Sequence, residues 1–140
     1  MNFKIRAATK EDCKDISRMI MELAAYVKAP DQVKISHEEL QGDGFCQNPF
    51  FECLVAEVPE EQKSKEGNGI GTGLLSKVAE VAKKKKQCVH LHLSVLDWNT
   101  PSRDFYAAKG AQDLTVTEGI HVLRFDGQNL DNLANEAPKD

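Results

Sequence analysis

The chain has no apolar run of membrane-spanning length, no excess of basic charge and no closely spaced cysteine pair. Its 140 residues carry a formal net charge of -4. This balance argues against nucleic acid as a partner and is compatible with a small cationic substrate. The N-terminal residues Met1–Lys4 form no secretory apolar segment. We therefore expect a cytoplasmic protein that makes no membrane contact.

Cysteine usage excludes a disulfide framework. Four cysteines are present, Cys13, Cys46, Cys53 and Cys88, and no two of them form a Cys-x-x-Cys pair. In a cytoplasmic chain of this length such spacing is typical of reduced, mostly buried thiols rather than of a zinc site.

Two histidines are the only other candidate for a metal site. His90 and His92 share one face of a predicted strand, but no third ligand lies near them in the sequence. We expect no bound metal.

The most informative stretch is Gly67-Asn68-Gly69-Ile70-Gly71-Thr72-Gly73, which precedes a predicted amphipathic helix from Leu74 to Ala82. Backbone N–H groups at such a helix start, with the helix dipole behind them, favour a bound phosphate. The stretch matches neither the Walker phosphate loop nor the full dinucleotide-binding spacing. Glycine turns also occur as plain helix starts, so the pattern alone leaves both interpretations open.

Residue patterns predict a single α/β domain over residues 1–140, without internal repeats. Alternating or apolar runs predict strands, whereas capping residues and apolar stripes predict helices. The predicted strands cover residues 3–6, 50–58, 89–95 and 120–125. The predicted helices follow Thr9, the capping box Ser36-x-x-Glu39 and a cap at Asn99 or Thr100.

Other segments are predicted to be loops, turns or helix ends. The charged run 60–66 is expected to be a solvated loop, and Gly42 or Gly44 ends the second helix. Gly110 closes the helix over residues 102–109. Lysines 83–86 fit a solvated helix end, because a helix C-terminus favours cations. The polar tail 126–140 is expected to hold at most one weak helical turn.

This element order is that of the GNAT acetyltransferases, and several sequence blocks in the right order resemble that family. Within it, they resemble the diamine (spermidine/spermine) N-acetyltransferases, and most of all the thialysine-acetylating type. The blocks are Asp43–Phe45, Asn48–Phe50, Cys53–Glu57, Gly69–Gly71, Val95–Asn99, Phe105-Tyr106 and Gly110–Leu114. The resemblance extends to about Phe125. It implies a GNAT fold, with a mixed central sheet flanked by helices, and a homodimer.

The resemblance also implies how acetyl-CoA would be held. Gly67, Asn68, Gly69, Ile70, Gly71 and Thr72 occupy the positions of the family's pyrophosphate loop. Asn99 and Ser102 occupy positions that contact the cofactor in the family. Tyr106 matches the family's proposed general acid, because a phenol hydroxyl can donate its proton to the departing coenzyme A thiolate.

On the substrate side, the resemblance implies three residues near the amine. Tyr26, His92 and Glu118 fall at the matching positions. A carboxylate suits a polyammonium ligand through charge-assisted hydrogen bonds. By itself, a glutamate in a turn is more often simply solvated.

The chain departs from the family between Glu57 and the glycine stretch. The family has two central strands there, and the second carries a Leu-Glu-Asp motif whose glutamate is, or positions, the base. Only residues 58–66 fill this interval. Glu66 also replaces an arginine, and its carboxylate would repel a pyrophosphate. Val27 stands where the polyamine enzymes have an acidic substrate contact.

Two explanations of this departure remain open. Either the molecule contains a segment that the sequence lacks, or the deletion is real. A real deletion would remove the base and leave strand edges open to association. It predicts weak CoA binding and negligible turnover. The first hypothesis is therefore an acetyl-CoA-dependent N-acetyltransferase acting on a primary amine of a diamine, polyamine or thialysine-like substrate. The alternative is a catalytically impaired acetyl-CoA-binding or dimerisation protein of the same fold.

Overall fold

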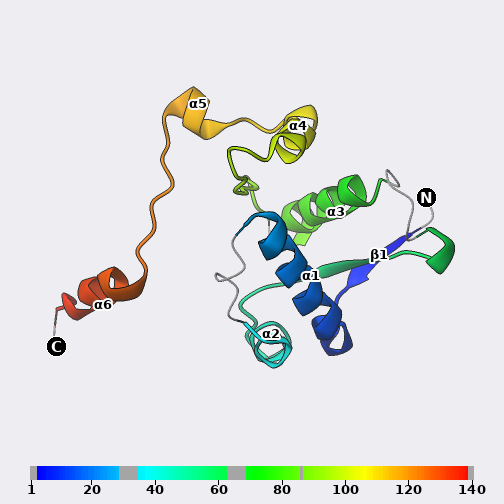
Figure 1. Ribbon diagram of the computed structural model, residues 1–140, viewed down its shortest axis with the longest axis horizontal. Helices are drawn as coiled ribbons and strands as arrows, with labels where there is room; N and C mark the ends of the chain where they lie inside the picture. Colours follow the sequence, from blue (N-terminus) through cyan, green and yellow to red (C-terminus); the bar gives the residue numbers. More distant parts are fainter. Residues whose placement is uncertain (1–2, 29–34, 63–68, 86, 139–140) are drawn as a thin grey trace. The chain divides into compact units, whose positions relative to one another are not determined.

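The protein is described by a computed structural model that covers residues 3–28, 35–62, 69–85 and 87–138. The chain divides into two units, Met1–Ser94 and Val95–Asp140. Figure 1 labels the helices and strands of both units. The predicted loop at residues 63–66, together with Gly67, Asn68 and Lys86, lies outside the described residues.

A two-stranded antiparallel sheet lies in the first unit. β1 (Lys4–Ala7) pairs with β2 (Leu54–Glu57), so that Lys4 faces Glu57 and Ala7 faces Leu54. Both strands are predicted from the sequence, but β2 is shorter than the apolar run 50–58. A strand extends only as far as a partner offers hydrogen bonds, and β1 has four residues.

Two helices follow β1, as their capping residues predict. A 3-10 turn, η1 (Lys10–Asp12), leads into α1 (Cys13–Tyr26), and the backbone N–H of Thr9 donates to the Asp12 carboxylate at 2.8 Å. α2 (His37–Gly44) starts at the predicted capping box. There, the N–H of Glu39 donates to the Ser36 hydroxyl at 3.1 Å. Helix α1 lies against α2, and Cys13, Ala24 and Leu40 form the buried core of this unit.

The later part of the glycine stretch is helical, whereas the sequence predicted that the whole stretch is a turn ahead of the helix. α3 (Ile70–Lys85) begins four residues earlier than expected, so Gly71, Thr72 and Gly73 are helical. The N–H of Gly73 donates to the carbonyl of Gly69 at 2.9 Å. Helix α3 packs against both strands of the sheet, and this packing outweighs the low helix propensity of glycine. After β2 comes a second 3-10 turn, η3 (Glu60–Gln62), where a loop was expected.

Two predicted strands are absent from the described part of the chain. Residues 89–95 and 120–125 contain no strand, although both runs have the expected apolar pattern. A strand requires a neighbour that satisfies its backbone groups. The sequence offers no further apolar segment ahead of the glycine stretch that would supply one. The prediction of strands at these two places was therefore wrong.

The second unit contains three helices. α4 (Thr100–Ala108) has Asn99 at its N-cap, as predicted, and Gly110 follows it with a φ of 97°. α5 (Leu114–Glu118) was not predicted, although Asp113 caps it and Gly119 ends it in the left-handed conformation. α6 (Gly127–Asn135) exceeds the single weak turn expected for the tail. None of these helices has a fully buried residue.

Candidate functional site

The start of α3 has the geometry of an anion-binding helix end. Gly69 has a φ of 74°, a left-handed conformation that favours glycine. Because the first helical hydrogen bond is donated by Gly73, the N–H groups of Ile70, Gly71 and Thr72 precede the hydrogen-bond ladder. Such groups point out of the helix end and carry its positive dipole. Gly69 and Gly71 are exposed, so a phosphate can approach this turn.

Helix α3 is seated on the sheet through one of its glycines. A Cβ at Gly73 would lie 2.9 Å from Cε2 and Cζ of Phe3 and 3.2 Å from Cδ1 of Ile5. The sequence analysis assigned no role to this contact. The short distances mean that the side chains of Phe3 and Ile5 lie directly against the backbone of α3 at Gly73, one helical turn after Gly69.

The residues expected around the thioester and leaving group gather on α4. The side-chain oxygen of Asn99, which is only 8% exposed, accepts from the N–H of Ser102 at 3.4 Å. Tyr106 lies one turn further along and is half-buried. Its ring is edge-on to that of Phe105, with 5.4 Å between the centroids. One short helix thus holds Asn99, Ser102 and Tyr106 at fixed spacing.

The three residues expected near the amine lie on three separate elements. Tyr26 is the last residue of α1 and is exposed. His92 lies in the extended segment after α3, with its ring centroid 5.7 Å from that of His90. Glu118 is the last residue of α5 and is exposed. Tyr26, His92 and the glycine turn belong to the first unit, whereas α4 and Glu118 belong to the second.

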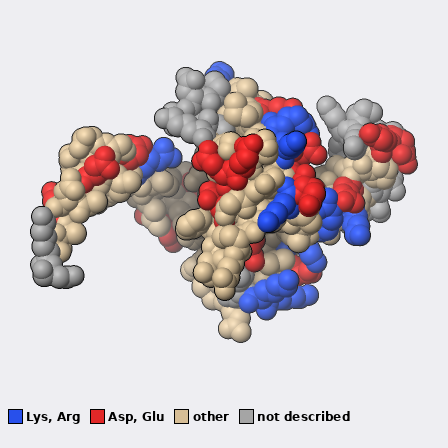
Figure 2. Space-filling view, turned by 90° about the horizontal axis from the view of Figure 1, so that it is seen from below, with Lys and Arg blue, Asp and Glu red and all other residues tan. Residues whose placement is uncertain are grey.

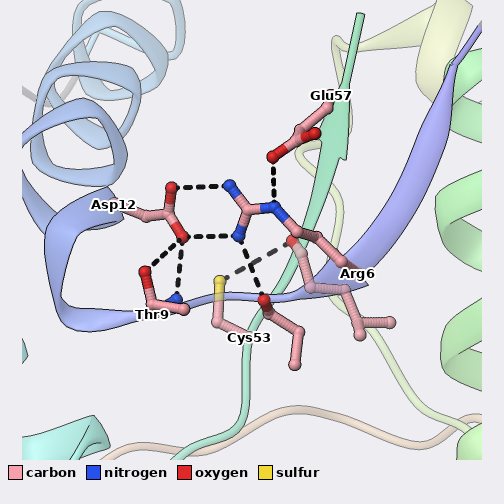
Figure 3. A network of polar contacts seen from close by, with 7 residues as sticks. Arg6, Thr9, Asp12, Cys53 and Glu57 are labelled. Atoms are coloured by element: carbon pink, nitrogen blue, oxygen red, sulfur yellow. Dashed lines mark hydrogen bonds and ion pairs between the residues drawn. The ribbon is translucent and has the colours of Figure 1, made fainter.

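The strongest polar cluster in the described chain centres on Arg6, which the sequence analysis did not single out (Figure 3). The guanidinium donates to the two carboxylate oxygens of Asp12 at 2.7 and 2.9 Å and also to Glu57. It therefore ties β1 to the start of α1 and to the end of β2. The hydrogen bond from Arg6, with a further one from the Thr9 backbone, holds the pKa of Asp12 well below its usual range.

This cluster is structural rather than catalytic. Glu57 is the last residue before the point where the sequence departs from the family pattern, but one of its carboxylate oxygens already accepts a hydrogen bond from Arg6. A general base needs an oxygen that is available to the substrate proton. We therefore assign Arg6, Asp12 and Glu57 to the framework of the first unit.

Thiol chemistry is also disfavoured at two of the four cysteines, Cys13 and Cys53. Burial is the main cause that raises the pKa of both Cys13 and Cys53. A thiol with a raised pKa stays protonated near neutral pH, and the protonated form is a poor nucleophile. Neither cysteine is therefore suited to carry an acetyl group between cofactor and amine.

Figure 2 shows acidic and basic side chains interspersed on the face that it presents. In the described ranges, no group of three or more His, Cys, Asp or Glu side chains has the arrangement of a metal site. Within the same ranges, no helix is both long enough and apolar enough to cross a membrane.

Comparison with known proteins matches this chain to a family and to individual relatives. The sequence pattern of the Acetyltransferase (GNAT) family matches residues 62–111, a range that contains the glycine stretch, α3 and α4. The thialysine N-epsilon-acetyltransferase of Bos taurus is 42% identical over 166 aligned positions, which cover 94% of this chain and 97% of that protein. The human spermidine/spermine N(1)-acetyltransferase-like protein 1 is 32% identical over 96% of this chain, but only 24% of that protein is covered.

The match to a solved structure concerns the fold. An integron cassette protein from the mobile metagenome of V. cholerae superposes with a TM-score of 0.67 over 97% of this chain and 99% of that protein, at 20% sequence identity. At this identity the likeness shows a common fold and nothing of function. The predicted fold class is thereby confirmed, although the strands named above did not form.

The alignment with the bovine protein also measures the departure from the family pattern. It has 166 positions, whereas 94% of 140 residues is about 132, so about 34 positions of the relative face gaps in this chain. Two central strands with their connections have about this length, since strands usually have 3–10 residues. The number of gapped positions thus matches the size of the two central strands that the sequence lacks.

Proposed function

This chain belongs to the GNAT acetyltransferase family, and from that premise we propose that it transfers an acetyl group from acetyl-CoA to a primary amine of a thialysine-like, diamine or polyamine substrate. The observation that carries the proposal is the 42% identity to a thialysine N-epsilon-acetyltransferase, of which 97% is covered. The alternative, a non-catalytic CoA-binding protein, is not favoured by these relatives. The whole chain acts as one domain, because the family pattern continues from residue 62 to residue 111, across the boundary of the two units.

The pyrophosphate of acetyl-CoA binds at the start of α3. The supporting observations are the left-handed Gly69 and the three N–H groups that precede the helical ladder. We assign Gly67 and Asn68 to the same loop because they match the loop positions of the family. The negative charge of Glu66, next to this loop in the sequence, repels the pyrophosphate. We therefore expect acetyl-CoA to bind less tightly than it would with a neutral residue at position 66.

Asn99 and Ser102 contact the cofactor from α4. The carbonyl oxygen of the Asn99 side chain is already used as the helix cap, so its amide nitrogen is the group that donates to the cofactor. Tyr106 acts as the general acid toward the coenzyme A thiolate. Its support is the family position and its place on the same helix, one turn after Ser102.

The amine side is formed by Tyr26, His92 and Glu118. An ammonium has no lone pair, so the substrate must lose a proton before it attacks the thioester. No base is assigned, because the family's glutamate lies in the missing block and Glu57 is paired with Arg6. The net charge of -4 suits a cationic substrate. A homodimer in the cytoplasm belongs to the same proposal and rests on the family resemblance.

The test is an acetylation assay on purified protein whose intact mass has been checked against 15.6 kDa. Thialysine, lysine, putrescine and spermidine are each offered with acetyl-CoA, and release of the coenzyme A thiol is followed. We expect turnover that is fastest with thialysine or a diamine. Absence of turnover with every amine, together with absence of CoA binding by calorimetry, would refute the proposal. Binding without turnover would favour the non-catalytic alternative.

A further inference from the structure

Two apolar side chains at the start of the chain converge on the first turn of α3. Phe3 directly precedes β1, and Ile5 lies two residues later, so both point to one face of the strand. A Cβ added at Gly73 would lie 2.9 Å from two carbons of the Phe3 ring and 3.2 Å from Ile5. These distances are shorter than ordinary carbon–carbon contact. Only a residue without a side chain fits between this face of the strand and the helix as they stand.

The contact lies directly behind the proposed pyrophosphate site. Gly73 donates the first hydrogen bond of α3, to the carbonyl of Gly69, and the three open N–H groups belong to the residues between them. One hydrogen-bonded helical turn moves as a unit. A displacement of the helix at Gly73 therefore displaces the N–H groups of Ile70, Gly71 and Thr72 by a similar amount.

The helix itself gains nothing from glycine at this position. Alanine is the better helix former, and the backbone of Gly73 does not have the positive φ that would require glycine. What glycine provides here is close approach of the strand to the helix. Phe3 and Ile5 then define how far the helix start lies from the sheet.

We propose that Gly73 and Phe3 are positioning residues for acetyl-CoA: their contact sets where the start of α3 presents its open N–H groups to the pyrophosphate. The inference rests on the proposed function, because it assumes that acetyl-CoA binds at this turn. Gly73 and Phe3 are not among the six residues, 67–72, assigned to the loop itself. Phe3 is separated from that loop by more than sixty residues of sequence.

The first variant is Gly73→Ala. Its methyl group overlaps the Phe3 ring, so either the ring turns away or the helix start moves. We expect the KM for acetyl-CoA to rise about 3- to 10-fold while kcat stays within about 2-fold, because pyrophosphate contacts are made equally in the ground state and the transition state. Calorimetric affinity for CoA should fall by the same factor.

Rescue by a second substitution separates positioning from general damage. Phe3→Ala removes the ring that the new methyl group meets. The double variant Phe3→Ala/Gly73→Ala should therefore recover CoA affinity to within about 2-fold of the single variant Phe3→Ala. Gly42→Ala is the matched control, since Gly42 is also helical but has no atom within 4 Å of an added Cβ. It should leave both kinetic constants unchanged.

The outcomes distinguish this inference from the proposed function. If the unmodified protein neither binds CoA nor turns over, the proposed function fails and the inference fails with it. If the unmodified protein binds CoA and Gly73→Ala binds it equally well, only the positioning role is wrong. If Gly73→Ala loses CoA affinity and adding Phe3→Ala does not restore it, the positioning role is also wrong. The loss of affinity would then arise from the glycine backbone. If Gly73→Ala does not fold, the double variant Phe3→Ala/Gly73→Ala takes its place in the test. It must then fold and bind CoA, and a double variant that does neither would overturn the positioning role.

Discussion

Two glycines in one helix should respond to alanine in opposite directions. Gly42 and Gly44 both lie in α2, two residues apart. A Cβ at Gly42 meets no atom within 4 Å, whereas a Cβ at Gly44 would lie 2.2, 2.5 and 2.8 Å from three carbons of the Phe51 ring. The substitution is chemically the same at both positions, so only the surroundings differ.

The magnitudes follow from these surroundings. At Gly42, alanine removes the entropic disadvantage of glycine in a helix, which should stabilise the protein by about 0.5–1 kcal/mol. At Gly44, the whole Phe51 ring has to move, although its edge is held against Phe45 with 6.3 Å between the centroids. Overpacking of this kind costs about 1–3 kcal/mol. The two variants should therefore differ by about 1.5–4 kcal/mol in the free energy of unfolding.

Urea unfolding followed by circular dichroism measures this difference. With a denaturant slope of about 2 kcal/mol per molar, the midpoints of the two variants should lie roughly 1–2 M apart, on either side of the unmodified protein. Replacing Phe51 by leucine should abolish most of the cost at Gly44. Equal midpoints for the two alanine variants would refute the packing of α2 against the segment that follows it.

Three further predictions concern acid stability, the start of α4 and the chemistry. Because Arg6 lowers the pKa of Asp12, their interaction stabilises the fold above the ordinary carboxyl pKa of 3.8 and is lost as the pH falls further below it. Asp12→Asn should lower the thermal midpoint at pH 7 by roughly 5 °C and flatten its decline below pH 4, whereas Asp15→Asn, on an exposed side chain, should do neither. Asn99→Ala removes a helix cap and should cost about 1 kcal/mol in denaturant unfolding; an unchanged midpoint would contradict that role. Tyr106→Phe should lower kcat about 100-fold with an unchanged thermal midpoint, and full activity in that variant would remove Tyr106 as the acid.

Helix ends were predictable because the interactions that define them are local. The Ser36 capping box, the Asn99 cap and the left-handed Gly110 each use atoms within four residues of one another. The same rule would have found α5, since Asp113 and Gly119 flank it. Leu114–Glu118 lacks an apolar stripe, so the hydrophobic pattern gave no sign of this helix.

The family and most of the proposed site were also accessible from the sequence. Short blocks such as Gly69–Gly71 and Phe105-Tyr106 preserve the residue types that the chemistry requires, and the comparisons confirmed the family. What each candidate residue does in this chain remains a prediction. The relatives establish the family without testing a single side chain.

Strands, packing and charge pairing were decided only by the tertiary structure. A strand needs a hydrogen-bonding partner from elsewhere in the chain. Among the residues that the structure describes, the apolar runs at 89–95 and 120–125 lack such a partner and are not strands, whereas β1 and β2 pair across about fifty residues of sequence. The same long range separates Phe3 from Gly73 and Arg6 from Glu57. By itself the sequence determined which residues are available and how each helix begins and ends. Which distant side chains meet depends on the fold, because contact between them is a property of the whole packed chain.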